Sequence, residues 1–367
     1  MTGYCIPYVL NGHLVSPKTP PAYRRPWASL RQRDSSTAKL LAARRSQQHK
    51  LSGGGTKTVF KLAFNQTEDH PQYVAGVELG KKLEEATDGR YSIRVYPNEQ
   101  LGGQADVVQN LSNGTVEMMW IAASILEGYN PDFVVFNLPY MFDSTEAQTQ
   151  VLSDTDLLSD LYTSLEASKS ITVLTGVNAG TRNVYNSKRP IQTPADMQGL
   201  KIRVQQSDSQ VAMIEAMGAT ASPMNFGDVY SAMQTGVLDG AENNEAVYHS
   251  MKHDEVAKYY SYTRHLLMPD YLLINSKTLA GMDDADREAL LGLLPEVQTM
   301  ANDGMVEFAN KSIAESEAIG AQFNDDVDVA AFKALVEPQN QASVNQNEAR
   351  IKLYEGVQAA NQAHPAK

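Results

Sequence analysis

An arginine at the end of a short strand carries the clearest chemistry in this sequence. Arg203 lies in residues 200–204, where apolar and basic side chains alternate as they do in a strand with one buried face. A guanidinium can hold a carboxylate through two parallel hydrogen bonds, and ligands of open α/β folds gather just beyond the carboxyl ends of strands. The pattern favours an anion clamp, although taken alone it also fits a surface ion pair.

Other arrangements with a catalytic or metal-binding spacing are incomplete. The glycines before Lys81 lack the spacing and the hydroxyl residue of a phosphate loop. His249 and His253 are spaced as neighbours on one helix, but no third ligand is near, so a solvated helix face is the better interpretation. Residues 325–328 lack the glycine and the final glutamate of a calcium loop. We therefore expect no metal, no cofactor and no catalytic residue.

The amino-terminal segment differs in composition from the rest of the chain. Residues 1–55 hold nine Lys or Arg and one acid, Asp34, and they include the only cysteine, Cys5. They contain no apolar stretch of the length of a secretory signal. We expect a disordered leader, an extension added for expression, or a misassigned start in place of the true signal. A nucleic-acid-binding arm is the alternative.

The remaining 312 of the 367 residues carry a formal charge of −20, since the whole chain has −12 and the leader +8. This charge argues against nucleic acid and anionic membranes as partners. The absence of cysteine after the leader excludes thiol catalysis and suits an oxidising compartment. No apolar run approaches the roughly 18 residues that span a membrane, so we expect a protein that is not membrane-embedded.

Alternating strand and helix patterns predict an α/β fold. Residues 59–64 and 91–96 alternate as strands on either side of a helix that begins at Pro71, which is a βαβ unit and predicts a parallel or mixed sheet. Residues 283–323 have an almost continuous helical pattern about 60 Å long, which exceeds the width of one domain, so we expect this helix to bridge two lobes. Further strands are expected at 116–121, 134–138, 171–177, 184–186, 200–204 and 266–274, and further helices at 209–217, 227–234 and 346–362.

Three consecutive segments extend the pattern around Arg203. They are residues 196–204, DMQGLKIRV, residues 218–230, GATASPMNFGDVY, and residues 233–244, MQTGVLDGAENN. With the shorter motifs DGR at 88–90, QLGG at 100–103, LPY at 138–140 and GTR at 180–182, they closely resemble the solute receptors of TRAP transporters. These receptors are the extracytoplasmic binding proteins of the C4-dicarboxylate-receptor family. The resemblance runs from about residue 59 to residue 362.

The resemblance implies a periplasmic-binding-protein-like α/β fold of two lobes with mixed sheets, a ligand cleft between the lobes and a long bridging helix. The predicted lobes are residues 56–179 plus 269–305 and residues 180–268 plus 306–367. It also implies a periplasmic receptor, not an enzyme, that acts as a monomer, binds a small organic acid and delivers it to TRAP membrane permease subunits. A sugar-acid lyase or isomerase with His265 or Glu242 as base is the alternative, and a sensory receptor is a third possibility.

The resemblance also assigns ligand-binding residues by motif position. Arg203 would clamp the ligand carboxylate, and Arg182 is the second family arginine. The other expected contacts are polar or aromatic residues of both lobes, namely Asn243, Phe226, His265 and Asn65, with Gln66 and His70 as secondary candidates.

The segment after Arg203 is most similar to receptors that bind hexuronates such as glucuronate or galacturonate. In that case Gln205, Asn65, Asn243 and Asn244 would offer hydrogen-bonding groups to ring hydroxyls. A C4-dicarboxylate is the alternative, with Arg182 holding the second carboxylate.

Three of these residues have structural interpretations that stay open. Asn243 could cap a turn, Phe226 could belong to the core, and His265 could be a buried histidine with its hydrogen bonds satisfied. Each interpretation makes a different prediction about exposure to the cleft.

The sequence departs from the family at two positions. Gln104 stands where many relatives have Glu, which removes one acidic partner, and Leu279 stands where many have Trp, which would change packing near the long helix. Trp120 near a strand end could instead offer a flat face to a sugar ring.

Overall fold

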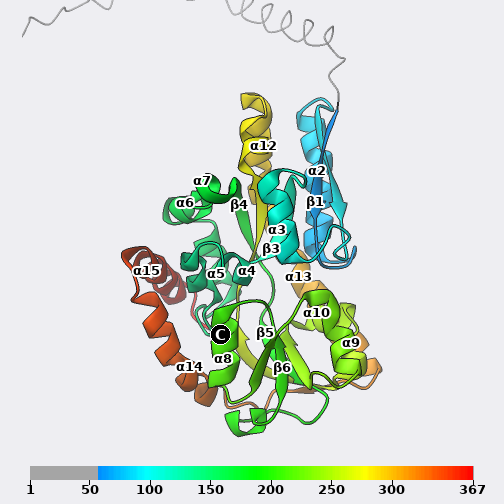
Figure 1. Cartoon of the computed structure of the whole chain (residues 1–367), viewed down its shortest axis with the longest axis vertical. Coiled ribbons are helices and arrows are strands. Elements are labelled where there is room, and N and C mark those ends of the chain that lie inside the picture. Colours follow the sequence, from blue (N-terminus) through cyan, green and yellow to red (C-terminus); the bar gives the residue numbers. More distant parts are fainter. Residues whose placement is uncertain (1–56, 367) are drawn as a thin grey trace, which may run out of the picture. The chain divides into compact units, whose positions relative to one another are not determined.

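The computed structural model describes residues 57–366, and the predicted leader at 1–55 lies outside the described residues. The described chain forms two lobes, each built on one mixed β-sheet (Figure 1). The strand order is β2-β1-β3-β10-β4 in lobe 1 and β11-β9-β5-β8-β6-β7 in lobe 2. The strands are β1 (Thr58–Ala63), β2 (Tyr91–Tyr96), β3 (Met118–Ala122), β4 (Ile171–Asn178), β5 (Arg182–Asn186), β6 (Lys201–Val204), β7 (Thr220–Pro223), β8 (Gly240–Asn243), β9 (Tyr259–Leu266), β10 (Pro269–Asn275) and β11 (Gln322–Asn324).

Helices cover both sheets. The α-helices are α2 (Pro71–Ala86), α3 (Gln104–Asn113), α4 (Ala123–Leu126), α5 (Thr145–Leu152), α6 (Thr155–Thr163), α7 (Glu166–Lys169), α8 (Asp208–Ala216), α9 (Val229–Gln234), α10 (Glu245–Ser250), α11 (His253–Val256), α12 (Ser276–Ala280), α13 (Asp284–Ala318), α14 (Val329–Val344) and α15 (Glu348–Ala363). Three short 3-10 helices are η1 (Pro131–Asn137), η2 (Pro194–Met197) and η3 (Phe226–Asp228). The predicted α/β fold with mixed sheets is confirmed.

The opening βαβ unit shows how the sequence builds lobe 1. Helix α2 begins at Pro71, whose fixed φ suits a first helical turn, and the side chain of His70 caps it. Its buried residues Leu79 and Leu83 lie one turn apart and face the sheet. Gly80 lies so close to β2 that a Cβ atom there would approach the carbonyl oxygen of Ile93 to 2.8 Å. Only glycine permits this distance between helix and strand.

Helix α13 connects the two lobes. It spans 35 residues, about 50 Å, and packs against α2 and β4 of lobe 1 and against α10 of lobe 2. The predicted bridging helix is therefore present, but it ends at Ala318 rather than near residue 323. Gly320 adopts a φ of +89°, which reverses the chain, and β11 then joins lobe 2 as a parallel neighbour of β9.

One strand prediction is wrong, and another is right for most of its length but misses a neighbouring strand. Residues 134–138, predicted as a buried strand, form most of η1, in which Phe133 and Val135 are fully buried. A short apolar run cannot distinguish a buried strand from a buried helical turn. The return strand predicted at 266–274 is β10 alone, and the preceding strand β9 was not predicted.

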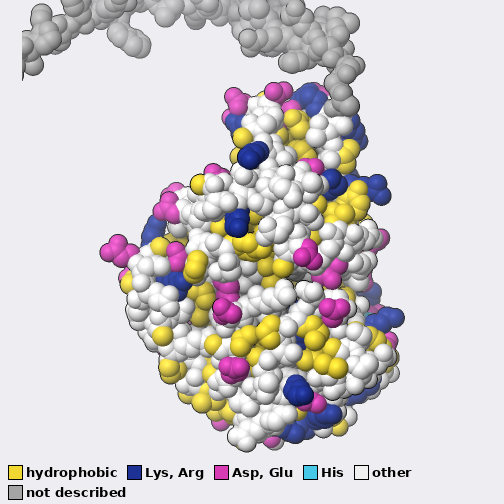
Figure 2. All heavy atoms as spheres, in the orientation of Figure 1, with side chains coloured by type: hydrophobic (Ala, Val, Ile, Leu, Met, Phe, Trp, Pro, Cys, Tyr) yellow, Lys and Arg dark blue, Asp and Glu magenta, His cyan; other side chains and the backbone are white. Residues whose placement is uncertain are grey.

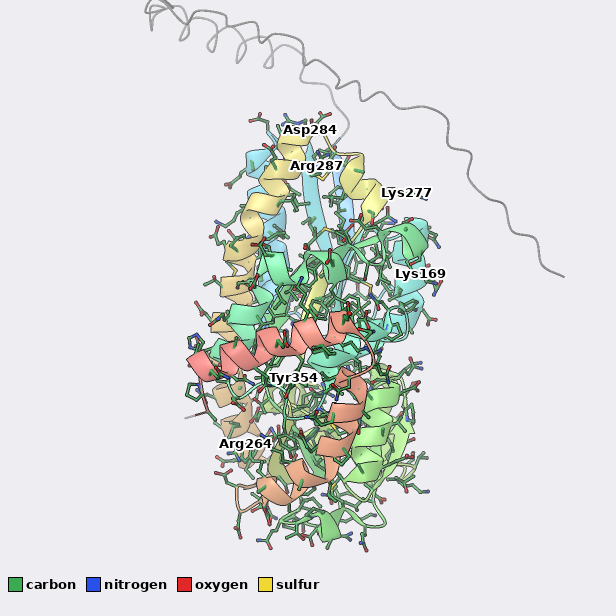
Figure 3. All side chains as sticks on the ribbon, turned by 90° about the vertical axis from the view of Figure 1, so that its left-hand side faces the viewer. Lys169, Arg264, Lys277, Asp284, Arg287 and Tyr354 are labelled. Carbon is green, nitrogen blue, oxygen red and sulfur yellow. The ribbon has the colours of Figure 1, made fainter. Side chains whose placement is uncertain are left out.

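The carboxyl terminus does not follow the predicted lobe boundary. Helix α14 packs on α8 and β9 of lobe 2, whereas α15 packs on α5, α6 and η1, and its Leu353 and Val357 are buried in the lobe 1 core. Figure 3 shows α15, which carries Tyr354, lying crosswise at the level between the lobes. The chain therefore crosses between the lobes once more after α14.

The sheet topology brings polar strand ends to the region between the lobes. In lobe 1, the parallel strands β1 and β3 end at the same edge where the antiparallel strand β10 begins. In lobe 2, the parallel strands β6 and β8 end where the antiparallel strand β5 begins. Residues just beyond these ends come from six strands of two sheets, which is where α/β folds bind ligands.

Candidate ligand-binding site

Two adjoining hollows lie between these strand ends, and both are lined by residues of both lobes. The Arg182 hollow is lined by Arg182 together with polar side chains that include Asn65, Asn243 and Asp270. The Arg203 hollow is lined by Arg203, Glu99 and Asn225, among others. Residues lining both are Gln104, Gln205 and Phe226. Figure 2 shows the lobes meeting across one face of the molecule, in keeping with the burial of these residues.

A larger hollow lies elsewhere, between α5, α10 and α13. Its volume is about 780 Å³, and it shares only Asn244 with the Arg182 hollow. No arginine or lysine lines it within the described chain. A carboxylate ligand would find no cation there, whereas each of the two smaller hollows contains a buried arginine between the strand ends, so we take these two as the candidate site.

Arg203 is a buried cation without a carboxylate partner. Arg203 lies on β6 and is 3% exposed. Its Nε and Nη2 donate to the Met224 carbonyl oxygen at 3.0 and 2.7 Å, and its guanidinium lies 5.9 Å from the centre of the Phe226 ring. No carboxylate of residues 57–366 lies within 4.0 Å of it. Burial lowers the pKa of Arg203 to about 10, so it remains charged at neutral pH.

Arg182, by contrast, is neutralised. Its Nε and Nη2 each donate to Glu242 at 2.6 Å, Nη2 also donates to the Glu242 carbonyl oxygen at 2.8 Å, and Nη1 donates to Asn243 at 3.0 Å. Burial opposes the ionisation of Glu242, but Arg182 and His265 outweigh it and hold the pKa of Glu242 at about 2. This corner of the cleft is a closed ion pair with both partners buried.

His265 is the predicted site residue that lines neither hollow. It is fully buried, with Nε2 3.4 Å from Glu242 and Nδ1 2.8 Å from the Thr263 hydroxyl. His265 and Arg182 both contact Oε2 of Glu242. The alternative interpretation, a buried histidine with satisfied hydrogen bonds, is the one that its position supports.

Asn243 and Asn244 line the Arg182 hollow, but their side chains also hold the backbone in place. The Asn243 side-chain oxygen accepts from Arg182 and from the backbone N–H of Asn244 at 2.9 Å. Asn244 caps α10 by accepting from the Val247 N–H at 2.8 Å and donates to the Ala179 carbonyl oxygen. The last contact joins lobe 2 to the connection between β4 of lobe 1 and β5 of lobe 2.

Lobe 1 supplies Asn65, Gln66 and His70, all buried and all at the Arg182 hollow. His70 accepts from the Gln72 N–H as the cap of α2, and burial lowers its pKa to about 3, so it is neutral. The side-chain oxygen of Gln66 is buried and has no hydrogen-bond partner among the described residues. Gln66 therefore has an acceptor to offer.

Gln205 and Phe226 occupy the shared wall of the two hollows. The Gln205 oxygen accepts from the Ser124 hydroxyl at 2.6 Å and from Gln210 at 3.0 Å, so it joins the two lobes. Phe226 is buried, as its structural interpretation predicted, and its ring still reaches the cleft beside Arg203. Burial is thus observed for Phe226, and contact with a ligand stays a prediction.

Sequence reasoning missed two acids. Asp270, the only acid in residues 266–274, accepts from Gln72 at 2.9 Å, and burial raises its pKa. Glu99 precedes the QLGG motif and lines the Arg203 hollow. An acid within an apolar strand was the available signal for Asp270. Gln104, the departure from the family, accepts from the Ala122 N–H at 3.2 Å and so is fixed to β3.

Two further sequence interpretations are wrong. Trp120 is 1% exposed and packs in the lobe 1 core with Phe60 and Leu62, because alternation along β3 turns it away from the cleft. His249 and His253 do not share a solvated helix, since α10 ends at Ser250. His253 is buried against the Tyr185 hydroxyl at 2.7 Å.

Residues 57–366 contain no group of three metal-ligating side chains. None of their helices combines the length and the apolar character needed to cross a membrane.

Comparison with known proteins agrees with the fold. The family model of bacterial extracellular solute-binding proteins, family 7, matches residues 62–347. A TRAP solute-binding protein of Anaerococcus prevotii, solved with bound D-glucuronate, is 33% identical, with a TM-score of 0.82 over 84% of this chain and 100% of that one. One of Bradyrhizobium sp., solved with D-galacturonate, is 32% identical, with a TM-score of 0.78 over 82% and 99%.

Similarity in sequence to a further relative supports the same family. A solute-binding protein of Chromohalobacter salexigens is 32% identical over 275 residues, which cover 73% of this chain and 80% of that protein. The match of the family model over most of the chain, together with the shared two-lobe fold, settles the membership. The chain belongs to family 7 of the bacterial extracellular solute-binding proteins, the receptors of TRAP transporters.

Proposed function

We propose that this protein is a periplasmic receptor that captures a hexuronate, such as glucuronate or galacturonate, and delivers it to TRAP membrane permease subunits. The observation that carries the proposal is Arg203, a buried cation beside a hollow with no carboxylate within ion-pair distance. A buried charge without a partner is costly, and a ligand carboxylate would supply the partner. The relatives solved with bound hexuronates support the same ligand class.

The state of Arg182 favours a ligand with one carboxylate over a C4-dicarboxylate. A dicarboxylate would require cations for both of its ends. Arg182 already has Glu242 as a bidentate partner and Asn243 as a further acceptor. Its charge is compensated, so a second carboxylate in the Arg182 hollow would meet the field of Glu242 and Asp270 as well.

Uncharged polar groups suit the rest of a sugar acid. Gln66 offers an unpartnered acceptor, and Asn65 lines the same hollow from the end of β1. Gln205 lies between this hollow and Arg203. Amide side chains both donate and accept, which matches hydroxyl groups that do the same.

The arrangement explains capture by lobe closure. A ligand between the strand ends would contact both lobes, and closure is favoured only by the extra contacts that it makes in the closed form. Exclusion of water then strengthens the attraction between Arg203 and the carboxylate. Micromolar binding corresponds to about −8 kcal/mol, which one charged clamp and several hydroxyl contacts can supply.

A binding role fits the cleft better than a lyase or isomerase. The two candidate bases are His265 and Glu242, and both are fully buried and engaged with other residues. With its pKa at about 2 and Arg182 bound to it, Glu242 is a poor proton acceptor. We expect mass spectrometry after prolonged incubation to recover a hexuronate unchanged, whereas any conversion product would favour the enzyme.

The experiment that tests the proposal is titration calorimetry with D-glucuronate, D-galacturonate and succinate. We expect a hexuronate to bind more tightly than succinate. Arg203→Ala should weaken hexuronate binding by about 2–5 kcal/mol, because a buried carboxylate loses its partner. Arg264→Ala is the matched control, since Arg264 lies on the surface of lobe 2 and pairs with Asp325 (Figure 3). Near-native affinity in Arg203→Ala would refute the clamp.

A further inference from the structure

Glu99 is an acid of lobe 1 that reaches the Arg203 hollow. It lies in the turn between β2 and α3, where its backbone adopts a φ of 54°, an uncommon conformation for a residue with a side chain. Its backbone N–H donates to the Phe64 carbonyl oxygen at 3.1 Å, which holds the turn. The backbone therefore fixes where the carboxylate lies.

The carboxylate contacts lobe 2 through Gly227. Against the larger effect of burial, the Gly227 backbone N–H favours the charged carboxylate and acts to lower the pKa of Glu99. A Cβ atom at residue 227 would lie 2.7 Å from Oε2 of Glu99, a distance that would displace the carboxylate. Glycine at this position is therefore what allows Glu99 to touch the opposite lobe.

The second carboxylate oxygen has no partner. Oε1 of Glu99 is buried and accepts no hydrogen bond from any described residue. A buried acceptor without a donor loses the hydrogen bonds that it made to water. A donor that enters the hollow would restore one.

The charges around Glu99 favour a neutral donor. Arg203 of β6 attracts its carboxylate, whereas Asp106 of α3 and Asp228 of η3 repel it, and burial, the largest influence, raises its pKa. A ligand carboxylate bound to Arg203 would add another negative charge to this hollow. A hydroxyl group can donate to Oε1 without adding charge, and a second carboxylate cannot.

We propose that Glu99 is a specificity-determining residue, whose free oxygen accepts a hydrogen bond from a hydroxyl of the bound acid and so discriminates against acids that lack one. This inference rests on the proposed capture of a sugar acid by Arg203. A sugar acid brings a carboxylate and nearby hydroxyls into the same hollow.

The test compares D-glucuronate with succinate, a hydroxyl-free acid, by calorimetry at constant pH. Glu99→Gln replaces one carboxylate oxygen with an amide NH₂, which cannot accept a hydrogen bond, and removes the negative charge. We expect glucuronate affinity to fall about tenfold or more and succinate affinity to rise, because a site built to bind a hydroxyl discriminates by about this much or more. Gly227→Ala should change the ratio of the two affinities in the same direction while the charge of Glu99 is kept.

The matched control is Asp228→Asn. Asp228 is an exposed acid whose charge acts on Glu99, but it lines neither hollow. Its removal should leave the ratio of the two affinities within about twofold, since exposed charges are screened. An equal change for both ligands in Glu99→Gln would overturn the role of Glu99. If wild-type protein binds neither glucuronate nor galacturonate, or Arg203→Ala retains binding, the proposed function itself is wrong. An unchanged ratio with binding lost in Arg203→Ala overturns only the inference about Glu99.

Discussion

Arg182 and Arg203 are two buried arginines of one sheet, on strands β5 and β6 that flank β8, and their surroundings differ. Their side chains are similarly inaccessible, with 4% and 3% exposure. Arg182 has a bidentate carboxylate at 2.6 Å, whereas Arg203 has a backbone carbonyl oxygen and the face of Phe226. The first charge is paired within the protein, whereas the second has no carboxylate of the described chain within 4.0 Å and is attracted by the more distant carboxylates of Glu242 and Glu99.

The difference separates a structural arginine from a binding arginine. A buried ion pair contributes little net stability, but removal of one partner leaves an isolated buried charge. Arg182 therefore depends on Glu242, and the fold depends on both. Arg203 already bears the cost of burial without a carboxylate, and a ligand anion would relieve that cost. Both residues lie within one family pattern, so only their partners distinguish them.

Glu242→Gln should have the largest effect on stability. It leaves Arg182 buried without a carboxylate, and we expect a loss of about 3–5 kcal/mol in the free energy of unfolding, measured with urea. The double variant Arg182→Met/Glu242→Gln removes both charges and should recover part of this loss. If the double variant is as unstable as Glu242→Gln, lost packing rather than an isolated charge is responsible.

Arg203→Met should act in the opposite direction on the ligand-free protein. It replaces a buried cation that lacks a carboxylate, so we expect the free energy of unfolding to stay constant or to rise by about 1–2 kcal/mol. Urea unfolding without ligand measures this change, and Arg182→Met provides the contrast, since it should destabilise. A loss in Arg203→Met as large as that in Arg182→Met would show that the two arginines are equivalent.

The same contrast shows what the sequence could predict. Alternation in residues 200–204 placed Arg203 at a strand end, and the motifs around it predicted the two-lobe fold. The ion pair of Arg182 with Glu242 was not predicted, because it depends on the antiparallel pairing of β5 with β8, whose members are distant in the chain. Which arginine stays uncompensated is decided by that pairing.

Lobe 1 was harder to predict than lobe 2. Asp270 and Glu99 reach the cleft from a strand and a turn that no local motif marks as functional, and only the converging strand ends bring them there. Trp120 shows the opposite failure. Its position near a strand end suggested the cleft, but alternation along β3 decides the face on which a side chain lies, and it directs Trp120 into the core.

The charge of Arg203 also acts on His253, and this gives a prediction about pH. Burial and then Arg203 lower the pKa of His253 to about 3, from the ordinary value of 6.5. Between these values the unfolded chain binds a proton that the folded chain does not, so stability is lost as pH falls from 6.5 towards 3. Urea unfolding at pH 6 and pH 5 should show a slope about 1.4 kcal/mol per pH unit smaller in His253→Phe than in wild type.

The quantity to compare is the pH slope of the free energy of unfolding and not its absolute value, because His253→Phe also loses the hydrogen bond to Tyr185. His70 has a pKa lowered to about 3 by burial in lobe 1, so an acid-dependent slope should persist in the variant. An unchanged slope in His253→Phe would mean that His253 is already protonated in the folded protein.

Lys188→Met should have the smallest effect on the free energy of unfolding. It removes an exposed ion pair next to the same two strands that the buried pair of Arg182 and Glu242 joins. Nζ of Lys188 lies 3.3 Å from a carboxylate oxygen of Asp239. The pair lies just outside β5 and β8, at the ends far from Arg182 and Glu242, and the Lys188 side chain is 53% exposed. Exposed ion pairs contribute about 0–1 kcal/mol, because water and salt screen them. Urea unfolding should show a change within that range that shrinks further in high salt. A loss comparable to that of Glu242→Gln would mean that position in the sheet, rather than burial of the charge, determines how strongly an ion pair holds β5 to β8.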